Sequence, residues 1–252
     1  MTDDSSELGS LLGRVESVEL KLTVDDSDHH SAVRALGLDP LAAQLRQVFF
    51  FDTDALGVDG AGLIVRARRR QGEPDDSVVK LRPVVPDELP KRVRRLAGFS
   101  LELDVTPHGH VCSASVEGAP RRAHIHEVAT KQAPVQTLFS KAQRAFFSEH
   151  APEGLELDTL EPLGPILVLR QPFVPHKRKR REWVAELWLY PDGSRLLELS
   201  TKCKPADVDR LIRDGRALVT DHDIDLSEEQ ETKTRTTLEY FAGLAREPSP
   251  AS

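Results

Sequence analysis

SVELKL, residues 17–22, alternates polar and apolar side chains without interruption. A period of two residues predicts a β-strand with one buried face, because successive side chains of a strand point to opposite sides. The apolar face is ordinary core. The polar face places the carboxylate of Glu19 beside the ammonium of Lys21, so it is either a solvated strand surface or the wall of a site.

Further segments repeat this alternation, and their polar faces are rich in Lys and Arg, with a carboxylate on most of them. The segments are 62–69, 77–83, 100–105, 166–172, 184–190 and 195–204. For any single strand, an antiparallel sheet with one solvated face is the simplest interpretation. Taken together, the charged faces favour a sheet that curls into a barrel with these faces inward. There, unlike charges offset one another's desolvation, and excess cations can bind a polyanion.

The residues predicted to face the interior are more often basic than acidic. The basic ones are Lys21, Arg66, Arg68, Lys80, Arg82, Arg170, Lys202 and Lys204, and the acidic ones are Glu19, Glu102, Asp104, Glu186 and Glu198. A basic excess suits phosphate groups. The remaining carboxylates suit a hard divalent cation such as Mg²⁺ or Mn²⁺, which prefers oxygen ligands.

Length and composition limit the organisation of the chain. Its 252 residues carry a net charge of -7, which argues against wholesale nucleic-acid binding. We expect a single domain over 14–245, with flexible tails at 1–13 and 246–252 that lack periodic apolar residues. No apolar run is long enough to cross a membrane, the N-terminus is no signal peptide, and the two cysteines imply no disulfide framework. We therefore expect a cytoplasmic protein, and the sequence indicates no particular oligomeric state.

The run HKRKRR at 176–181 has two interpretations. It is either a nucleic-acid or localisation patch, or the start of the strand that carries Glu186. We favour the strand. Counting back from Glu186 by twos then places Arg180 and Arg178 inside the barrel.

The C-terminal segment 226–245 predicts an amphipathic helix that begins with a capping box at Ser227 and Gln230. Two of its basic residues, Lys233 and Arg235, either line one mouth of the barrel or form surface salt bridges. Surface salt bridges are the favoured interpretation.

The ordered set of motifs resembles the CYTH family, the triphosphate tunnel metalloenzymes. The N-terminal family motif ExExK corresponds to Ser17-Val18-Glu19-Leu20-Lys21, in which the second Glu and the Lys match. The segment FFFDTDALGVDGAGLIVRARRR (49–70) resembles the aromatic–Asp–Thr motif and the following strand with alternating arginines. The strand VVKLRP, the acidic strand LELDV and the hairpin VAELWLYPDGSRLLELSTK follow in the family's order. The resemblance extends over most of residues 14–204.

The resemblance implies an α+β fold, a closed eight-stranded antiparallel β-barrel that is open at both ends and braced by helices. Basic side chains in this tunnel would hold a triphosphate, and acidic ones would hold one or two divalent cations. Family activities include hydrolysis of inorganic triphosphate, thiamine triphosphate or RNA 5′-triphosphate, and adenylate cyclisation. The ligand expected from the resemblance is thus a triphosphate-containing small molecule, with RNA 5′-triphosphate as the one nucleic-acid option.

By resemblance, Glu19 and Lys21 are the expected catalytic residues. Lys21 would also contact phosphate, together with Arg66, Arg68, Lys80, Arg82, Arg170, Arg178, Arg180 and Lys202. The expected ligands of Mg²⁺ or Mn²⁺ are Glu19, Glu102, Asp104, Glu186 and Glu198.

Two departures from the family pattern each remove a carboxylate. Ser17 replaces the first motif Glu, and Ser200 replaces the last acid of the closing hairpin. Glu16 could supply the first missing acid only if the strand were bulged. We expect a divalent-metal-dependent triphosphatase, with an adenylate cyclase of the same fold and a non-catalytic polyphosphate or nucleotide sensor as alternatives.

Overall fold

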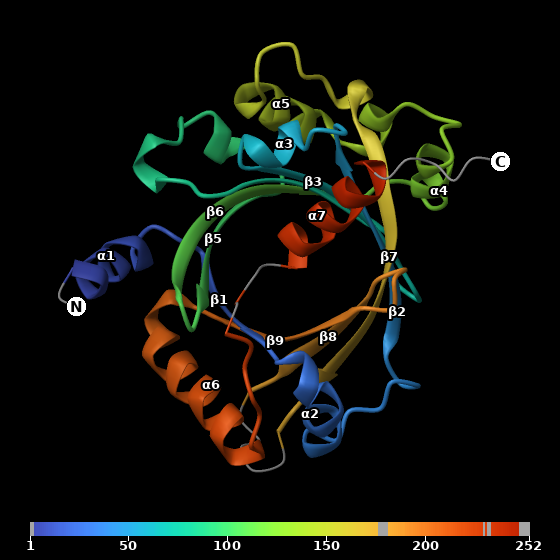
Figure 1. The fold of residues 1–252 in the computed structure, drawn as a ribbon. Coiled ribbons are helices and arrows are strands. Elements are labelled where there is room, and N and C mark those ends of the chain that lie inside the picture. The colour runs from blue at the N-terminus through green and yellow to red at the C-terminus, as the bar shows by residue number, and fades with distance from the viewer. Residues whose placement is uncertain (1–2, 176–180, 229, 231–232, 247–252) are drawn as a thin grey trace.

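The computed structural model describes residues 3–175, 181–228, 230 and 233–246. Within these residues, nine strands close into one barrel in the order β1-β5-β6-β4-β3-β2-β7-β8-β9, with β9 pairing back onto β1 (Figure 1). The strands are β1 (Ser17–Thr23), β2 (Gln44–Asp52), β3 (Leu63–Arg70), β4 (Asp76–Leu81), β5 (Phe99–Thr106), β6 (Gly109–Gly118), β7 (Glu161–Phe173), β8 (Trp183–Leu189) and β9 (Arg195–Cys203).

The predicted closed barrel with bracing helices is confirmed, but eight antiparallel strands is wrong in detail. The described chain has nine strands, and β1 pairs with β5 in parallel, with Ser17 opposite Glu102 and Glu19 opposite Asp104. The two differences have one cause. Strand directions cannot alternate all the way around a closed barrel with an odd number of strands, so at least one neighbouring pair must be parallel.

Helices and short 3₁₀ turns join the strands, and most of them lie outside the barrel. The helices are α1 (Asp3–Leu12), α2 (His29–Ala35), α3 (Gly57–Gly60), α4 (His124–Ala129), α5 (Lys141–His150), α6 (Val208–His222) and α7 (Lys233–Arg246). The 3₁₀ turns are η1 (Asp26–Asp28), η2 (Pro86–Glu88), η3 (Val93–Arg95), η4 (Val135–Leu138), η5 (Leu157–Thr159) and η6 (Pro205–Asp207). Thus α1 occupies much of the segment expected to be an N-terminal tail, and the flexibility of both tails stays a prediction. None of the described helices is both long and apolar enough to span a bilayer.

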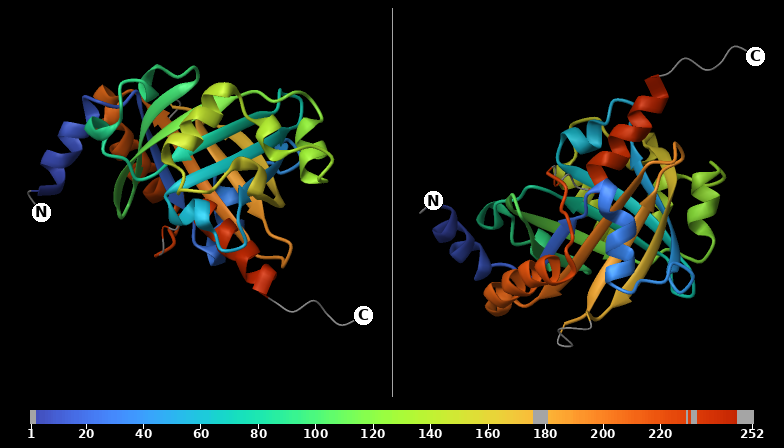
Figure 2. Two further views of the ribbon diagram at one scale, coloured as in Figure 1. Left: turned by 90° about the horizontal axis from the view of Figure 1, so that it is seen from above. Right: turned by 60° about the horizontal axis from the view of Figure 1, so that its bottom comes forward.

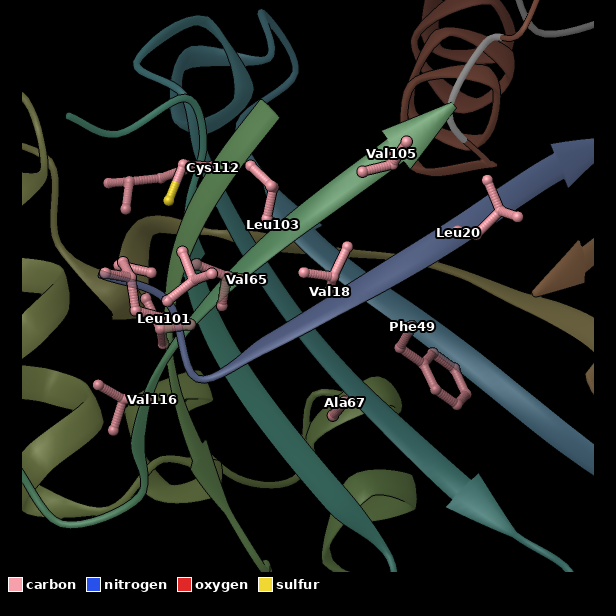
Figure 3. Packing of buried hydrophobic residues seen from close by; sticks show 14 of the residues in the cluster. Val18, Leu20, Phe49, Val65, Ala67, Leu101, Leu103, Val105, Cys112 and Val116 are labelled. Carbon is pink, nitrogen blue, oxygen red and sulfur yellow. The ribbon is translucent and has the colours of Figure 1, made fainter. Parts of the chain in front are cut away.

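The main hydrophobic core lies between the outer face of the barrel and these helices. Val18, Leu20, Val65, Leu103 and Val116 belong to it, on the strand faces that point away from the interior (Figure 3). This burial on one face explains the two-residue period, because the alternate positions must then point into the barrel.

Helix α6 packs directly on β1 and β9. A Cβ atom at Gly215 would lie 2.3 Å from Cδ2 of Leu20, so only glycine allows this close approach without a shift of the leucine. Strand β1, which carries the opening motif, is therefore held from outside by α6 and from both sides by β5 and β9.

A second apolar cluster fills one end of the barrel interior. Val48, Phe50, Ile166, Val168 and Trp188 continue the inward faces of β2, β7 and β8. Helix α7 packs against this cluster through Leu238, which is fully enclosed at 2 % exposure. Figure 2 shows α7 at one end of the barrel, with its C-terminal end directed away from the strands. The expectation of a tunnel open at both ends is thus wrong for this chain, because α7 occupies one of them.

A charged cavity inside the barrel

The rest of the barrel interior is a cavity of about 750 Å³. Its basic side chains outnumber its acidic ones. All but one of the described residues predicted to face inward line it or contact a residue that does; they are Glu19, Lys21, Arg66, Arg68, Lys80, Arg82, Glu102, Asp104, Arg170, Glu186, Glu198 and Lys202. The prediction is wrong for Lys204, which is exposed, because β9 ends at Cys203 and Lys204 caps the 3₁₀ turn η6. The predicted residues Arg178 and Arg180 lie outside the described part of the chain. The strand periodicity therefore placed charged residues from seven strands around a shared space.

Asp104 is the centre of one cluster of charges. Its carboxylate has no solvent exposure and pairs with Lys21 at 2.9 Å and with Lys80 and Arg82 at 3.5 Å each. Burial alone would raise the pKa of Asp104, but these three cations hold it well below its usual range. Because three cations share one carboxylate, the cluster has a net positive charge that faces the cavity.

The two lysines of this cluster differ in their surroundings. Burial lowers the pKa of Lys80, although Asp104 opposes the effect. Burial also acts on Lys21, but Asp104 and Glu19 together raise its pKa above the ordinary value. Glu19 lies 3.4 Å from the Lys21 ammonium, so the proposed catalytic residues are neighbours. Lys21 is thus held as a cation between two carboxylates, and Lys80 is the less stabilised charge.

The start of β1 meets the middle of β5 next to this cluster. Ser17 Oγ donates a hydrogen bond to Glu102 Oε1 at 3.1 Å, and Lys202 Nζ donates to the same oxygen at 2.7 Å. Lys202 also lies 3.9 Å from Glu19. Glu16 is exposed and lies outside β1, so it does not supply the acid that Ser17 lacks.

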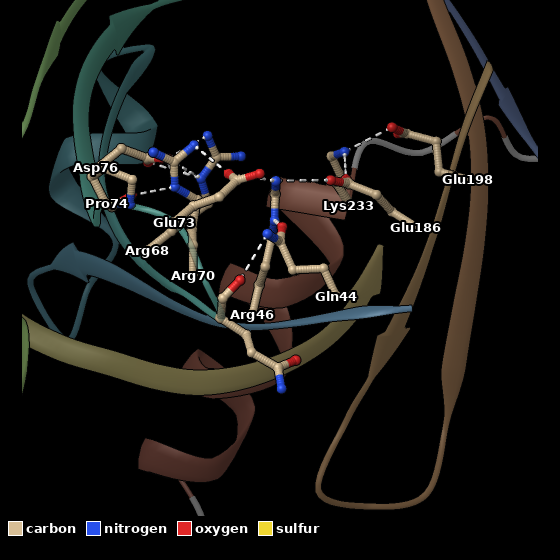
Figure 4. Close-up of polar contacts among 11 residues, drawn as sticks. Gln44, Arg46, Arg68, Arg70, Glu73, Pro74, Asp76, Glu186, Glu198 and Lys233 are labelled. Carbon is tan, nitrogen blue, oxygen red and sulfur yellow. Dashed lines mark hydrogen bonds and ion pairs between the residues drawn. The ribbon is translucent and has the colours of Figure 1, made fainter. Parts of the chain in front are cut away.

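Arginines from β2, β3 and β7 form the opposite wall of the cavity. Arg68 makes a two-pronged ion pair with Asp76 at 2.8 and 2.9 Å, a geometry that holds the guanidinium plane fixed (Figure 4). Arg46 is buried and lies 3.7 Å from Glu186. In contrast, no carboxylate of the described chain lies within ion-pair distance of Arg66 or Arg170.

The charge of this arginine wall is incompletely neutralised. The Nε atom of Arg66 is buried and has no hydrogen-bond partner among the described residues. Burial, with the Arg68 guanidinium adding to it, lowers the pKa of Arg66 to about 10. The same two causes lower the pKa of Arg46 to about 10, although Glu186 opposes them. Burial of a cation without an anion is unfavourable in free energy, so this wall favours the binding of a negatively charged ligand.

Sequence reasoning missed Arg46. Residues 44–52 are not among the segments predicted to be strands, whereas Gln44–Asp52 forms strand β2 with Arg46 and Val48 on the inward face. The run of three phenylalanines at 49–51 hides the two-residue period, because Phe50 faces inward while its neighbours face the outer core. Assignment of residues 44–52 to a strand would have placed Arg46 on the inward face, opposite Arg70 of β3.

Lys233 corrects the interpretation of the last helix. It does not form a surface salt bridge; its ammonium lies inside the barrel and donates hydrogen bonds to Glu186 and, at 2.7 Å, to Glu198 (Figure 4). The same ammonium lies 5.3 Å from the ring centre of Trp188. Arg235 agrees with the prediction, because it pairs with Glu239 on the exposed side of the helix.

The described residues do not fit a divalent cation held by protein ligands alone. No three His, Cys, Asp or Glu side chains in the described ranges come together as a metal-binding group. Every carboxylate expected to bind metal has a lysine or arginine within ion-pair distance; these are Glu19, Glu102, Asp104, Glu186 and Glu198. Ser200, the second departure from the family motif, is buried and lines the same cavity from β9.

Comparison with solved structures identifies the fold. The chain superimposes on a protein from Hippeastrum with a TM-score of 0.61 and 17% identity over 89% of this chain and 96% of that one. The fold is that of the triphosphate tunnel metalloenzymes. The Hippeastrum protein, proposed to be an adenylyl cyclase, is described as having a dominant triphosphatase activity.

A second structure of the triphosphate tunnel fold gives the same result. It is a protein from Bacillus halodurans proposed to be an adenylate cyclase, with a TM-score of 0.60 and 12% identity over 88% of this chain and 97% of that one. No family model and no curated protein sequence matches the chain. The likeness therefore concerns the fold, and the activity must be argued from the cavity.

Proposed function

We propose that the cavity binds the phosphate chain of a triphosphate, inorganic or organic, and hydrolyses it. The observation that carries this proposal is the arginine wall, where Arg66 and Arg170 face the cavity without a carboxylate partner. A ligand with several adjacent negative charges would supply the missing anion for both. The cavity volume of about 750 Å³ also lies in the usual range of small-molecule sites, roughly 300–1,000 Å³.

The two walls of the cavity would contact different phosphates of the triphosphate. The guanidinium of Arg68, fixed by Asp76, is suited to two-pronged contact with phosphate oxygens together with Arg66. On the other side, the surplus charge of the Asp104 cluster would face the remaining phosphates through Lys80 and Arg82. Phosphoryl transfer depends mainly on positioning and on neutralising charge, and both walls act in this way.

Lys21 and Glu19 are proposed as the catalytic pair. Lys21 is kept protonated by its two carboxylate neighbours, so it can stabilise charge that develops on a phosphoryl oxygen. Glu19 lies at the cavity surface beside it and would orient the attacking water. The proposed reaction depends on Mg²⁺ or Mn²⁺, which when bound would polarise phosphate and lower the pKa of water, whereas in the free protein the carboxylates expected to hold the ion are paired with cations.

A non-catalytic polyphosphate or nucleotide sensor is the second candidate. It is favoured by the serines at positions 17 and 200, where the family motif has acidic residues, and by the Lys233 ammonium, which lies between Glu186 and Glu198. The cyclase alternative has the same phosphate cavity but needs contacts to a nucleoside, for which the described cavity wall offers no aromatic side chain.

One screen separates the three functions. Purified protein is incubated with inorganic triphosphate, thiamine triphosphate, ATP or an RNA 5′-triphosphate, each with Mg²⁺ or Mn²⁺. Orthophosphate release supports the hydrolase, whereas pyrophosphate with cyclic nucleotide supports the cyclase. A rise in melting temperature without turnover supports the sensor, since a ligand that binds only the folded state stabilises it. Absence of both turnover and stabilisation with all four compounds would contradict the proposal.

A further inference from the structure

Helix α7 enters the barrel and is held there at several points. The Tyr190 hydroxyl and Thr237 Oγ1 are 3.1 Å apart, and Leu238 packs in the apolar cluster. Just before the helix, the Gln230 amide accepts a hydrogen bond from the backbone N–H of Thr23 at 2.9 Å and donates to the Thr23 carbonyl at 3.0 Å. These contacts hold α7 against the apolar cluster and the end of β8, and they hold Gln230, which precedes the helix, against β1.

Docking of α7 places the Lys233 ammonium between the carboxylates of Glu186 and Glu198. Glu186 and Glu198 are directly opposite each other in the β8–β9 pairing, and both bind Nζ of Lys233. Burial would raise the pKa of Glu186, but Lys233, with Arg68 and Arg46 farther away, holds it well below its usual range. The Lys233 ammonium thus lies between the two carboxylates as their shared counter-charge.

A pair of ionised carboxylates, completed by water, is a common way for proteins to bind Mg²⁺. Here the position between the two carboxylates is taken by an amine from a distant part of the chain. We propose that the Lys233 ammonium takes the place of a divalent cation between Glu186 and Glu198, so that docking of α7 and binding of metal at this pair exclude each other. This fits the serine at position 200, two residues from Glu198 on β9, because a carboxylate pair that is neutralised internally does not need a further acidic ligand there.

The competition involves no phosphate, so it can be tested independently of the proposed function. Binding of Mn²⁺ to the full chain is measured by electron paramagnetic resonance, which reports free Mn²⁺ directly, without triphosphate. The variants are Lys233→Met and Lys233→Gln, with Arg235→Gln as the matched control on the same helix. Lys233→Gln keeps a hydrogen-bond donor between the carboxylates and serves if the methionine variant fails to fold.

Removing the Lys233 charge should tighten Mn²⁺ binding about tenfold or more, since the carboxylate pair loses its internal cation. Arg235→Gln should bind Mn²⁺ as the wild type does. Adding Glu198→Gln to Lys233→Gln should abolish the gain, which places the metal at the carboxylate pair. The inference is overturned if wild type and both Lys233 variants bind Mn²⁺ equally, if none of them binds it, or if the gain survives Glu198→Gln.

Tryptophan fluorescence, to which Trp188 and Trp183 both contribute, provides a second readout on the wild-type chain. Because the Lys233 ammonium lies over the Trp188 ring, its departure should change the emission. Saturating Mg²⁺, which does not itself quench tryptophan, should change the emission of wild type and leave that of Lys233→Gln unaltered. Equal responses of the two proteins would contradict displacement of the helix by metal.

Discussion

Lys21 Nζ lies 2.9 Å from Oδ1 of Asp104, the most deeply buried carboxylate of the cavity wall. The pair connects β1 to β5, the parallel neighbours in the barrel. It therefore joins the stability of the fold to the charge of the cavity, because the same carboxylate also pairs with Lys80 and Arg82.

Replacement of Asp104 by Asn should destabilise the free protein strongly. The change keeps the shape but leaves three cations without their shared anion, and breaking a buried ion pair costs about 3–5 kcal/mol. Urea unfolding measures the loss. Asp54→Asn, at an exposed loop position, is the control and should stay within about 0.5 kcal/mol of wild type. A loss for Asp104→Asn as small as that of the control would show that the cluster contributes little to folding.

Stability should fall as the solution is made acidic. The pKa values of Asp104 and Glu186 are lowered in the folded state, from ordinary values of 3.8 and 4.5. Their contribution is fully present above these ordinary values and is lost as the pH falls below them towards the folded pKa values. Unfolding free energies measured from pH 7 to pH 3 should decline below about pH 4.5, and Glu186→Gln should flatten the decline. An equally steep decline in that variant would argue against a role for Glu186.

The sequence was sufficient to predict the inward faces of most strands. Lys80, Arg66 and Glu186 each stand at alternate positions between residues that pack in the outer core, and this burial leaves one orientation for the charged side chains. The parallel β1–β5 pair could not be predicted in this way, because 85 residues separate the paired positions and no turn motif fixes their relative direction.

Lys233 and Arg46 are two cavity residues that the sequence pattern did not predict. An amphipathic helix with a lysine in its first turn is compatible with a solvated surface. Its entry into the barrel depends on the packing of Leu238 in a cluster of apolar side chains from β2, β7, β8 and β9. Arg46 precedes an apolar run that is buried on both faces, so the two-residue period vanishes where it was needed.

Lys80 should make triphosphate binding depend on pH in the alkaline range. Its pKa is lowered from 10.5 by burial, so its charge and the affinity should be lost as the pH rises through a value below 10.5. Titration calorimetry with inorganic triphosphate between pH 7 and pH 10 measures the effect. Lys80→Arg should retain the affinity and depend less on pH than the wild type, with the remaining dependence due to Arg66, whereas Lys80→Ala should bind weakly at every pH. If Lys80→Ala bound as tightly as wild type, Lys80 would have no contact with phosphate.

Ser17→Glu should restore the first acid of the family motif. The new carboxylate would lie beside Glu102, at the place where Ser17 now donates its hydrogen bond. Two adjacent carboxylates attract a divalent cation, so Mn²⁺ affinity should rise about tenfold. Any Mn²⁺-dependent orthophosphate release should rise with it. Ser17→Gln, which has similar size but no charge, is the control, and an equal response of both variants would remove charge as the explanation.

The contrast between Arg66 and Arg69 tests the cavity most directly. The two arginines lie on the same strand, but Arg66 faces the cavity whereas Arg69 binds Gln47 on the outside of the barrel. The measurement is calorimetric titration of inorganic triphosphate into wild type, Arg66→Gln and Arg69→Gln, in EDTA and again with Mg²⁺. Loss of a charge-assisted contact should weaken binding to Arg66→Gln about tenfold or more, while Arg69→Gln binds as wild type does. Equal affinity of wild type and Arg66→Gln, or no binding of triphosphate to the wild-type protein, would contradict the assignment of the barrel interior as a triphosphate site.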